Sequence, residues 1–167
     1  MPPILSTRRH FVAAAGAVST LPFLASCGEG VIARKERTFR ITKTDAQWRR
    51  ELTRQEYRIL REAGTERAYS SPLDNENRPG VFSCAACDNQ LYGSVHKYDS
   101  RTGWPSFWRA IDGGAVGTST DYLIGYARTE VHCADCGGHL GHIFGDGPRP
   151  TGKRHCINGV AMNFTPA

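Results

Sequence analysis

The sequence predicts a mainly β domain of antiparallel strands with short helices on its N-terminal side. Beyond Gly80, short apolar or alternating segments are separated by glycine, asparagine, aspartate and proline, which is typical of antiparallel strands joined by tight turns. Before Ser70, two helix-start motifs occur instead. The segments expected to contribute strands are GVFSC, FWRAI, YLIGYA, TEVHC, HLGHIF and VAMNF.

The two helix-start motifs are capping boxes, at Thr44–Gln47 and Thr53–Glu56. In each, the threonine hydroxyl and the glutamine or glutamate side chain satisfy backbone amides reciprocally at the start of a helix. Apolar residues follow the second box at helical spacing, and Gly64 is expected to end that helix in the left-handed conformation. We expect these helices to cover the core.

The first 26 residues are predicted to be a signal peptide. Arg8 and Arg9 precede an uncharged run from Phe11 to Leu24, which falls short of the roughly 20 apolar residues that a membrane span needs. The arginine pair resembles the twin-arginine export signal. Without these two arginines the net charge of +5 becomes about +3, which is too small to indicate a nucleic-acid partner.

The end of this run, Leu24–Cys27, resembles the lipobox of bacterial lipoproteins, in which the cysteine is lipidated. The alternative is an ordinary cleavage site with an incidental cysteine. We expect lipidation of Cys27 and a location on the periplasmic face of a bacterial membrane. Residues 27–42 are expected to form a linker, and residues 43–167 one domain that is a monomer.

Four cysteines form two C-x-x-C pairs, Cys84/Cys87 and Cys133/Cys136. Two such turns can supply the four thiolates of a tetrahedral zinc site, and a full set of four leaves no open position, so the metal would be structural. Two disulfides or redox-active pairs are the alternatives. No helical pattern follows either pair, which disfavours a redox role, and twin-arginine export of a folded chain permits zinc loading before exposure to oxidant.

Cys156 has no cysteine near it in the sequence. In an extended chain it shares a face with Asn158, and Lys153, Arg154 and His155 are expected to favour its thiolate. A reactive thiol and a buried small hydrophobe are both compatible with this pattern.

His139 and His142 lie upstream of Cys156. Residues three apart point to opposite faces of a regular strand, so the pattern favours one histidine facing away, unless a bulge at Gly141 turns both inward. Turn polarity or metal binding are alternative roles for them. The aromatic residues of GWPSFW (Gly103–Trp108) are compatible with plain core packing, and we assign Trp108 to it.

These motifs, in this order, resemble methionine-R-sulfoxide reductase (MsrB). The resemblance is carried by the C-x-x-C pairs, LTRQEYRILREAGTERAYSSPL, GWPSFW, CGGHLGHIFGDGP and CINGVAMNF, and it spans about Lys43 to Phe164. It implies two small antiparallel sheets, helices packed outside, and structural zinc away from the active site. It also implies reduction of the R epimer of methionine sulfoxide, free or in proteins.

The same resemblance implies site roles. Cys156 matches the nucleophile, which becomes a sulfenic acid, and His139 and His142 match the histidines that contact and protonate the sulfoxide oxygen. Asn158 matches the asparagine beside the nucleophile, and Trp104 the indole that receives the substrate methyl group. Phe144 and Phe164 match pocket-lining positions.

One departure concerns recycling. Many family members carry a resolving cysteine just before Gly-Trp-Pro-Ser, where this chain has Thr102. An external thiol, such as that of a thioredoxin-like protein, is therefore expected to reduce Cys156 directly. Two rival functions are a zinc-knuckle module that binds protein or nucleic acid through aromatic residues, and an inactive scaffold that keeps the fold.

Overall fold

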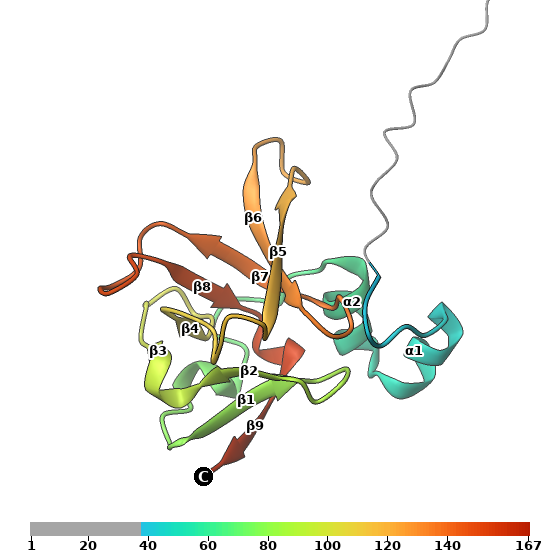
Figure 1. Ribbon diagram of the computed structural model, residues 1–167, viewed down its shortest axis with the longest axis horizontal. Coiled ribbons are helices and arrows are strands. Elements are labelled where there is room, and N and C mark those ends of the chain that lie inside the picture. Colours follow the sequence, from blue (N-terminus) through green and yellow to red (C-terminus); the bar gives the residue numbers. More distant parts are fainter. Residues whose placement is uncertain (1–37) are drawn as a thin grey trace, which may run out of the picture. The chain divides into compact units, whose positions relative to one another are not determined.

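Two antiparallel sheets carry most of the chain in the computed structural model, which describes residues 38–167 (Figure 1). The three-stranded sheet has the order β2-β1-β9 and consists of β1 (Gly80–Cys84), β2 (Gln90–Gly93) and β9 (Met162–Pro166). The six-stranded sheet has the order β3-β4-β8-β7-β6-β5 and consists of β3 (Lys97–Tyr98), β4 (Ser106–Phe107), β5 (Val116–Asp121), β6 (Arg128–Cys133), β7 (His139–Phe144) and β8 (Arg154–Ile157). The predicted mainly β fold is confirmed.

The two predicted helices are α1 (Asp45–Glu51) and α2 (Arg54–Glu62), and both capping boxes are formed. The end of α2 differs from the prediction, because Ala63 and not Gly64 adopts the left-handed conformation, with φ of 51°. Gly64 instead donates its amide to the Arg58 carbonyl. A β-carbon on residue 64 would lie only 2.8 Å from that carbonyl oxygen. Within residues 38–167, no helix is long and apolar enough to cross a membrane.

The strand prediction fails for YLIGYA. Strand β5 ends at Asp121 and β6 begins at Arg128, so these six residues form the tip of a hairpin. Gly125 has φ of +88° and donates its amide to the Tyr122 carbonyl, which closes the turn. The apolar composition of the segment therefore reflects exposure at a tip, and not burial in a strand.

An aromatic cluster joins the two sheets. Phe82 of β1 lies 5.1 Å from Phe107 of β4, centroid to centroid, and Tyr92 of β2 stacks on Phe107 at 4.3 Å. All three side chains are fully buried. Pairs of this kind contribute about 0.5–1.5 kcal/mol each beyond their buried area. Helix α2 packs against β7 and the short 3₁₀ turn η3 (Gly159–Ala161), with Ile59 and Leu60 buried.

The predicted signal peptide, Cys27 and most of the predicted linker lie outside the described residues. The last linker residues are described, and they contact the domain. Phe39 packs edge-on against His132, the Arg40 side chain pairs with Asp135, and Ile41 donates its amide to the Asp135 carbonyl at 2.8 Å. The chain is therefore attached to the domain from about Phe39 onward.

Strand β8 lies between β4 and β7 in the six-stranded sheet, so Cys156 faces Ser106 on one side and His142 on the other. Gly141 lies next in the β7 register, where a β-carbon would fall 2.0 Å from the Cys156 carbonyl oxygen. Only a residue without a side chain permits this approach of the two strands.

Gly141→Ala is expected to lower the free energy of unfolding by about 1–3 kcal/mol or more, because the methyl group must push β8 away from β7. Urea unfolding monitored by circular dichroism measures this. Gly113→Ala is the matched control, since nothing lies within 4 Å of the added methyl group there. Equal midpoints for the two variants would contradict the close approach.

Candidate active site and metal centre

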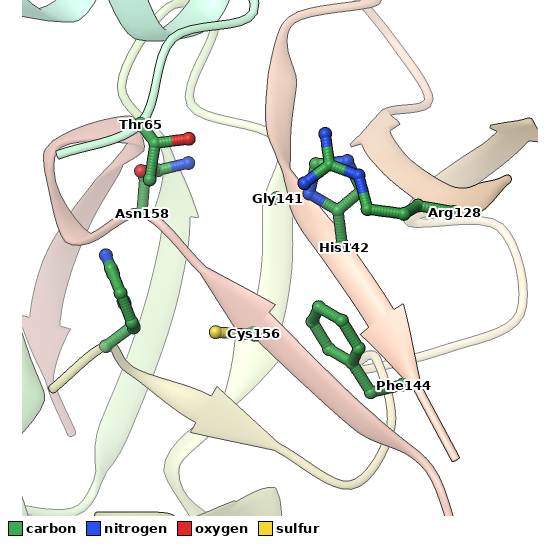
Figure 2. A pocket seen from close by; sticks show the side chains of 8 residues that line it. Thr65, Arg128, Gly141, His142, Phe144, Cys156 and Asn158 are labelled. Carbon is green, nitrogen blue, oxygen red and sulfur yellow. The ribbon is translucent and has the colours of Figure 1, made fainter. Parts of the chain in front are cut away.

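Cys156 lines a cavity of about 150 Å³ at the middle of the six-stranded sheet (Figure 2). In Figure 2, Thr65 and Asn158 lie on one side of the sulfur, and Arg128, His142 and Phe144 on the other. The cavity residues are Thr65, Trp104, Arg128, Gly141, His142, Phe144, Cys156 and Asn158. Five of the residues predicted for the site thus come together here, from β7, from β8 and the residue after it, and from the loop before β4.

His139 and His142 lie on one face of β7 because the strand contains a bulge. Val131 pairs with Gly141, but the next residue of β6, His132, pairs with His139, so Leu140 is the extra residue. The two histidine rings lie 5.3 Å apart, centroid to centroid. The regular-strand expectation that one histidine faces away is therefore wrong, and the bulge alternative is found.

His142 reaches the cavity with its Nε2 atom held by Asp121 at 2.8 Å. Burial lowers the pKa of His142, and this outweighs the opposing effect of the Asp121 carboxylate. Burial also pushes the pKa of Asp121 up, but hydrogen bonds from the Leu123 amide, His142 and Arg128 outweigh it and bring the pKa to about 2. An ionised Asp121 thus orients an imidazole that is readily neutral at pH 7.

His139 is buried beside His142 and does not itself line the cavity. Its Nδ1 lies 2.9 Å from a Glu130 oxygen, and that hydrogen bond helps to bring the pKa of Glu130 to about 2. Its Nε2 has no hydrogen-bond partner within residues 38–167. A buried nitrogen without a partner is costly, which makes this atom available to a bound group or water.

The electrostatic surroundings of Cys156 differ from the sequence-based expectation. Burial raises the pKa of the Cys156 thiol, and the Arg154 charge and the Thr102 hydroxyl act against it. Arg154 is held by two 2.9 Å bonds to Asp146 and lies over the Phe144 ring at 4.5 Å.

His155 adds no positive charge at neutral pH. Burial, with a contribution from Lys153, lowers the pKa of His155 to about 4. Its Nδ1 lies 3.2 Å from the buried Tyr92 hydroxyl, away from the cavity residues. Arg154 is therefore the cation of this motif that acts on the thiol.

Glu66 connects Asn158 and Trp104, and it was not predicted from the sequence. Its amide donates to the Asn158 side-chain oxygen at 2.9 Å, and its carbonyl accepts the Trp104 indole N–H at 3.3 Å. Its buried carboxylate accepts the amides of Gly159 and Val160 at 2.7 and 2.9 Å. Asn158 in turn donates to the Leu140 carbonyl at 2.9 Å.

Other polar residues of the site were also missed, namely Thr65, Asp121, Arg128, Glu130 and Asp146. Acidic residues near a histidine in space carry no signal when they lie on different strands. Phe164 does not line the cavity. It lies on β9, where its ring packs against Phe82 at 4.9 Å and under Arg78, because β9 belongs to the other sheet.

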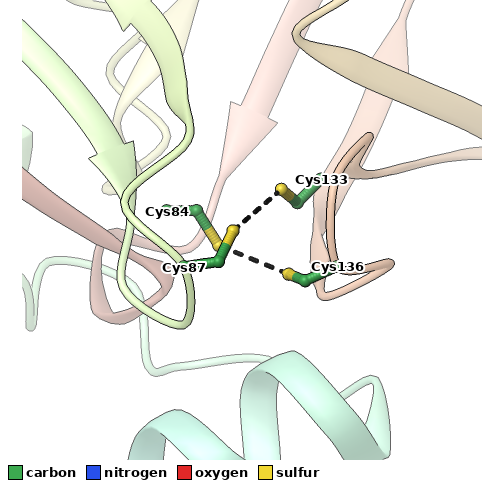
Figure 3. A group of neighbouring side chains, drawn as sticks. All are labelled: Cys84, Cys87, Cys133 and Cys136. Atoms are coloured by element: carbon green, nitrogen blue, oxygen red, sulfur yellow. Dashed lines mark hydrogen bonds between the residues drawn. The ribbon is translucent and has the colours of Figure 1, made fainter. Parts of the chain in front are cut away.

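The four paired cysteines meet where β1 and β6 end (Figure 3). The sulfur atoms of Cys84 and Cys136 lie 3.8 Å apart, those of Cys87 and Cys133 3.5 Å apart, and all four lie within 4.8 Å of one another. Disulfide sulfurs are about 2.05 Å apart. Four thiolates at about 2.3 Å from a central zinc are separated by about 3.8 Å, so this set suits a bound metal ion.

Both C-x-x-C turns have the geometry of a metal knuckle. Asp88 and Gly137 adopt positive φ values of 58° and 69°, and each donates its amide back to the first cysteine of its turn. Asn89 points its side-chain amide at the Cys133 sulfur, 3.4 Å away. Strand β6 carries Cys133 at one end and the cavity residue Arg128 at the other, about 17 Å away along an extended chain. The metal centre is therefore separate from the cavity.

Comparison with known proteins identifies the family. The SelR domain matches residues 52–166. A peptide methionine sulfoxide reductase MsrB of Agrobacterium fabrum is 50% identical over 127 residues, covering 76% of this chain and 94% of the relative. An MsrB of Thiobacillus denitrificans is 52% identical over 124 residues, with coverages of 74% and 94%, and one of Leifsonia xyli is 49% identical over 129 residues, with coverages of 77% and 93%.

The chain belongs to the MsrB family of peptide methionine sulfoxide reductases. The fold of this chain keeps two features apart. The cavity brings together Cys156 and His142 of the motifs that carried the resemblance, and the four-cysteine centre forms a second, closed site.

The free energy of unfolding is expected to fall as the pH drops from about 4.5 to about 2. Glu130 ordinarily titrates near 4.5, and its pKa in the fold is about 2, mainly through His139. The unfolded chain therefore binds this proton more tightly. The stabilisation by Glu130 is complete above its pKa in the unfolded chain and is lost as the pH falls through its pKa in the fold. It amounts to at most about 3 kcal/mol.

Urea unfolding of the wild type and Glu130→Gln between pH 7 and pH 2 tests this, with the smaller loss expected for the variant. Glu62→Gln, at an exposed carboxylate, is the control, and its free energy of unfolding should depend on pH as that of the wild type does. The same pH dependence of the free energy of unfolding in the wild type and Glu130→Gln would contradict this role of Glu130.

Proposed function

We propose that this enzyme reduces the R epimer of methionine sulfoxide, free or within proteins, with Cys156 as its nucleophile. The observation that carries the proposal is the cavity itself, which brings the Cys156 sulfur, the His142 imidazole and the Trp104 indole to one small space. The relatives are named peptide methionine sulfoxide reductases, which supports the substrate class.

The chemistry follows from these groups. The thiolate of Cys156 attacks the sulfoxide sulfur, which becomes electrophilic when its oxygen is protonated or strongly hydrogen-bonded. The imidazolium form of His142, which Asp121 holds, or of His139, whose Nε2 has no partner among the described residues, is positioned to supply that proton. The oxygen passes to the cysteine, so the products are methionine and a sulfenic acid on Cys156.

The shape of the cavity supports the choice of one epimer. Trp104 is held by its hydrogen bond to the Glu66 carbonyl, so its indole presents a fixed apolar surface to a methyl group. If the methyl group lies there, the oxygen lies toward His142 and the rest of the substrate leads out of the cavity, only one configuration at sulfur presents that sulfur to Cys156. Asn158 is fixed by Glu66 and Leu140 beside the sulfur.

Regeneration requires a thiol from outside the chain. Thr102 occupies the position of the resolving cysteine, and the other cysteines among residues 38–167 all belong to the metal centre. The external thiol attacks the sulfenic sulfur and releases water, and a second thiol then breaks the mixed disulfide. A thioredoxin-like protein fits this role.

We also propose that the four-cysteine centre binds one zinc ion and that the enzyme is exported and lipid-anchored through Cys27. A set of four thiolates is the preference of structural zinc. Export rests on Arg8 and Arg9, and the anchor on Leu24–Cys27. Mass spectrometry of the native protein tests the anchor, since an unmodified Cys27 in the mature chain contradicts it.

Cys156→Ser is expected to abolish reduction, by at least about a thousandfold, because the hydroxyl cannot replace the thiolate. Racemic methionine sulfoxide is incubated with dithiothreitol, and the epimers are separated by chromatography. The wild type should consume the R epimer alone. Consumption of both epimers contradicts the proposed selectivity, and no turnover at all by metal-loaded protein favours a scaffold or binding module.

A single turnover without reductant tests the regeneration step. Dimedone, which reacts with sulfenic acids, should label Cys156 under these conditions. An intramolecular disulfide to any other cysteine would contradict the need for an external thiol.

Cys84→Ser is expected to lose the metal and to lower the free energy of unfolding by about 4 kcal/mol or more, because a structural metal is bound only by the folded chain. Elemental analysis and thermal unfolding measure the two effects. Cys156→Ser is the matched control and should keep one zinc per chain. A wild-type protein without metal, or with two disulfides, would overturn the zinc assignment.

A further inference from the structure

Four large apolar side chains are exposed together at the tip of the β5–β6 hairpin. Their exposed fractions are 68% for Tyr122, 74% for Leu123, 53% for Ile124 and 59% for Tyr126. In Figure 1 the hairpin projects beyond the body of the six-stranded sheet. Grouped apolar exposure of this kind is typical of an interaction surface.

The base of this hairpin is part of the cavity. Asp121, the last residue of β5, holds His142 at 2.8 Å and Arg128 at 2.5 Å. Arg128, the first residue of β6, lines the cavity. The tip residues therefore follow directly, along the chain, from two residues at the edge of the site.

The volume of the cavity indicates which part of a protein substrate must stay outside it. A space of about 150 Å³ accommodates a single side chain, so the polypeptide that bears a methionine sulfoxide must lie outside it. Residues 122–127 carry no charge, and Asp121 and Arg128 neutralise each other. Such a surface selects by apolar contact, which unfolded segments offer more than folded surfaces do.

We propose that the hairpin tip, Tyr122–Tyr126, binds apolar polypeptide on either side of the oxidised methionine. This inference rests on the proposed reductase function and adds a docking surface for the polypeptide that bears the oxidised methionine.

The test compares two substrates with dithiothreitol as the only reductant, namely free methionine sulfoxide and an oxidised, permanently unfolded polypeptide. Replacing all four tip side chains by serine should raise the KM for the polypeptide by about tenfold to a hundredfold and leave kcat/KM for the free substrate within about twofold. Val95→Ser, at another exposed apolar residue, is the control and should change neither.

Three results would overturn the docking surface. Equal losses for both substrates would mean that the hairpin acts only through His142. A loss that appears only with a thioredoxin in place of dithiothreitol would assign the tip to the reductant, and a loss of vesicle binding without a change in KM would assign it to lipid. Failure of the wild type to reduce either substrate would instead refute the proposed function itself.

A second, independent observation concerns the three hydroxyl groups beside Cys156. The Thr102 hydroxyl lies near Cys156 and lowers the pKa of its thiol, and its Oγ1 lies 2.8 Å from Ser100 Oγ. Ser100 Oγ lies 2.7 Å from Ser106 Oγ, which donates to the Trp104 carbonyl at 3.1 Å. Ser106 and Cys156 are direct partners in the β4–β8 ladder. A chain of hydrogen bonds therefore runs from Thr102, next to the Cys156 sulfur, to the Trp104 backbone.

Each hydroxyl has one proton to donate, so the number of protons determines which group donates to which along these hydrogen bonds. When Ser106 donates to the Trp104 carbonyl, Ser100 donates to Ser106 and Thr102 donates to Ser100. Thr102 then accepts the proton of a neutral thiol. When the sulfur is anionic, the chain must reverse so that Thr102 donates to it.

We infer that Thr102 is a catalytic residue whose hydroxyl donates to the Cys156 thiolate and accepts from the sulfenic acid. At the position where relatives carry a resolving cysteine, this chain carries a group that holds the oxidised sulfur until a thiol arrives. The inference depends on the proposed nucleophile and is tested without sulfoxide turnover.

Thr102→Val keeps the shape and removes the hydroxyl, whereas Thr102→Ser keeps the hydroxyl. The rate of Cys156 alkylation by iodoacetamide is measured against pH in both, after the metal centre is confirmed as loaded. The midpoint should rise by about one pH unit in the valine variant and return to the wild-type value in the serine variant. A wild-type midpoint in Thr102→Val would overturn the role.

The fate of the oxidised sulfur supplies a second measurement. With peroxide as oxidant, dimedone labelling of Cys156 should decay faster in Thr102→Val and the sulfinic acid should accumulate earlier by mass spectrometry. Equal lifetimes in the valine and serine variants would also overturn the role.

Discussion

The buried carboxylate of Glu66 is the contact on which the geometry of the site depends. Burial raises the pKa of Glu66, and the amides of Val160 and Gly159 oppose that effect by bonding its charged form. Hydrogen bonds to a buried charged group are worth about 1.5–3 kcal/mol each. Because the same residue also bonds Asn158 and Trp104 through its backbone, the segment after α2, the tryptophan loop and the end of β8 have one relative position.

A second constraint is the spacing of the three strands around Cys156. The missing side chain of Gly141 lets β7 approach β8, and the bulge at Leu140 turns both histidines to the same face. Ionised Asp121 and Glu130 then hold these rings from β5 and β6. Cys156 and the two histidines are thereby placed on rigid strands, which position chemical groups more accurately than loops do.

The four-cysteine centre and the cavity lie in different parts of the fold. The four-cysteine centre ties the end of β1 to the end of β6, and through Asp135 it also receives the N-terminal segment near Arg40. This anchors the end of the six-stranded sheet farthest from the hairpin tip. At the other end, Tyr122 and its neighbours are exposed, and this is where we propose that a polypeptide substrate binds. A closed structural centre and an open reactive one can therefore share strand β6 without sharing ligands.

The sequence by itself determined the mainly β fold, both capped helices and the pairing of Cys84/Cys87 with Cys133/Cys136, because capping, turn chemistry and C-x-x-C spacing are local. It also indicated Cys156 and Asn158, which are near neighbours in the chain. Only the tertiary structure decided that YLIGYA is an exposed tip, that His155 is neutral and that Phe164 lies in the other sheet. It alone revealed Glu66, since the bonds from this residue to Asn158 and Gly159 join positions more than 90 residues apart. Local patterns carry no record of such contacts, because strand pairing, burial and charge neighbours arise only when distant segments pack together.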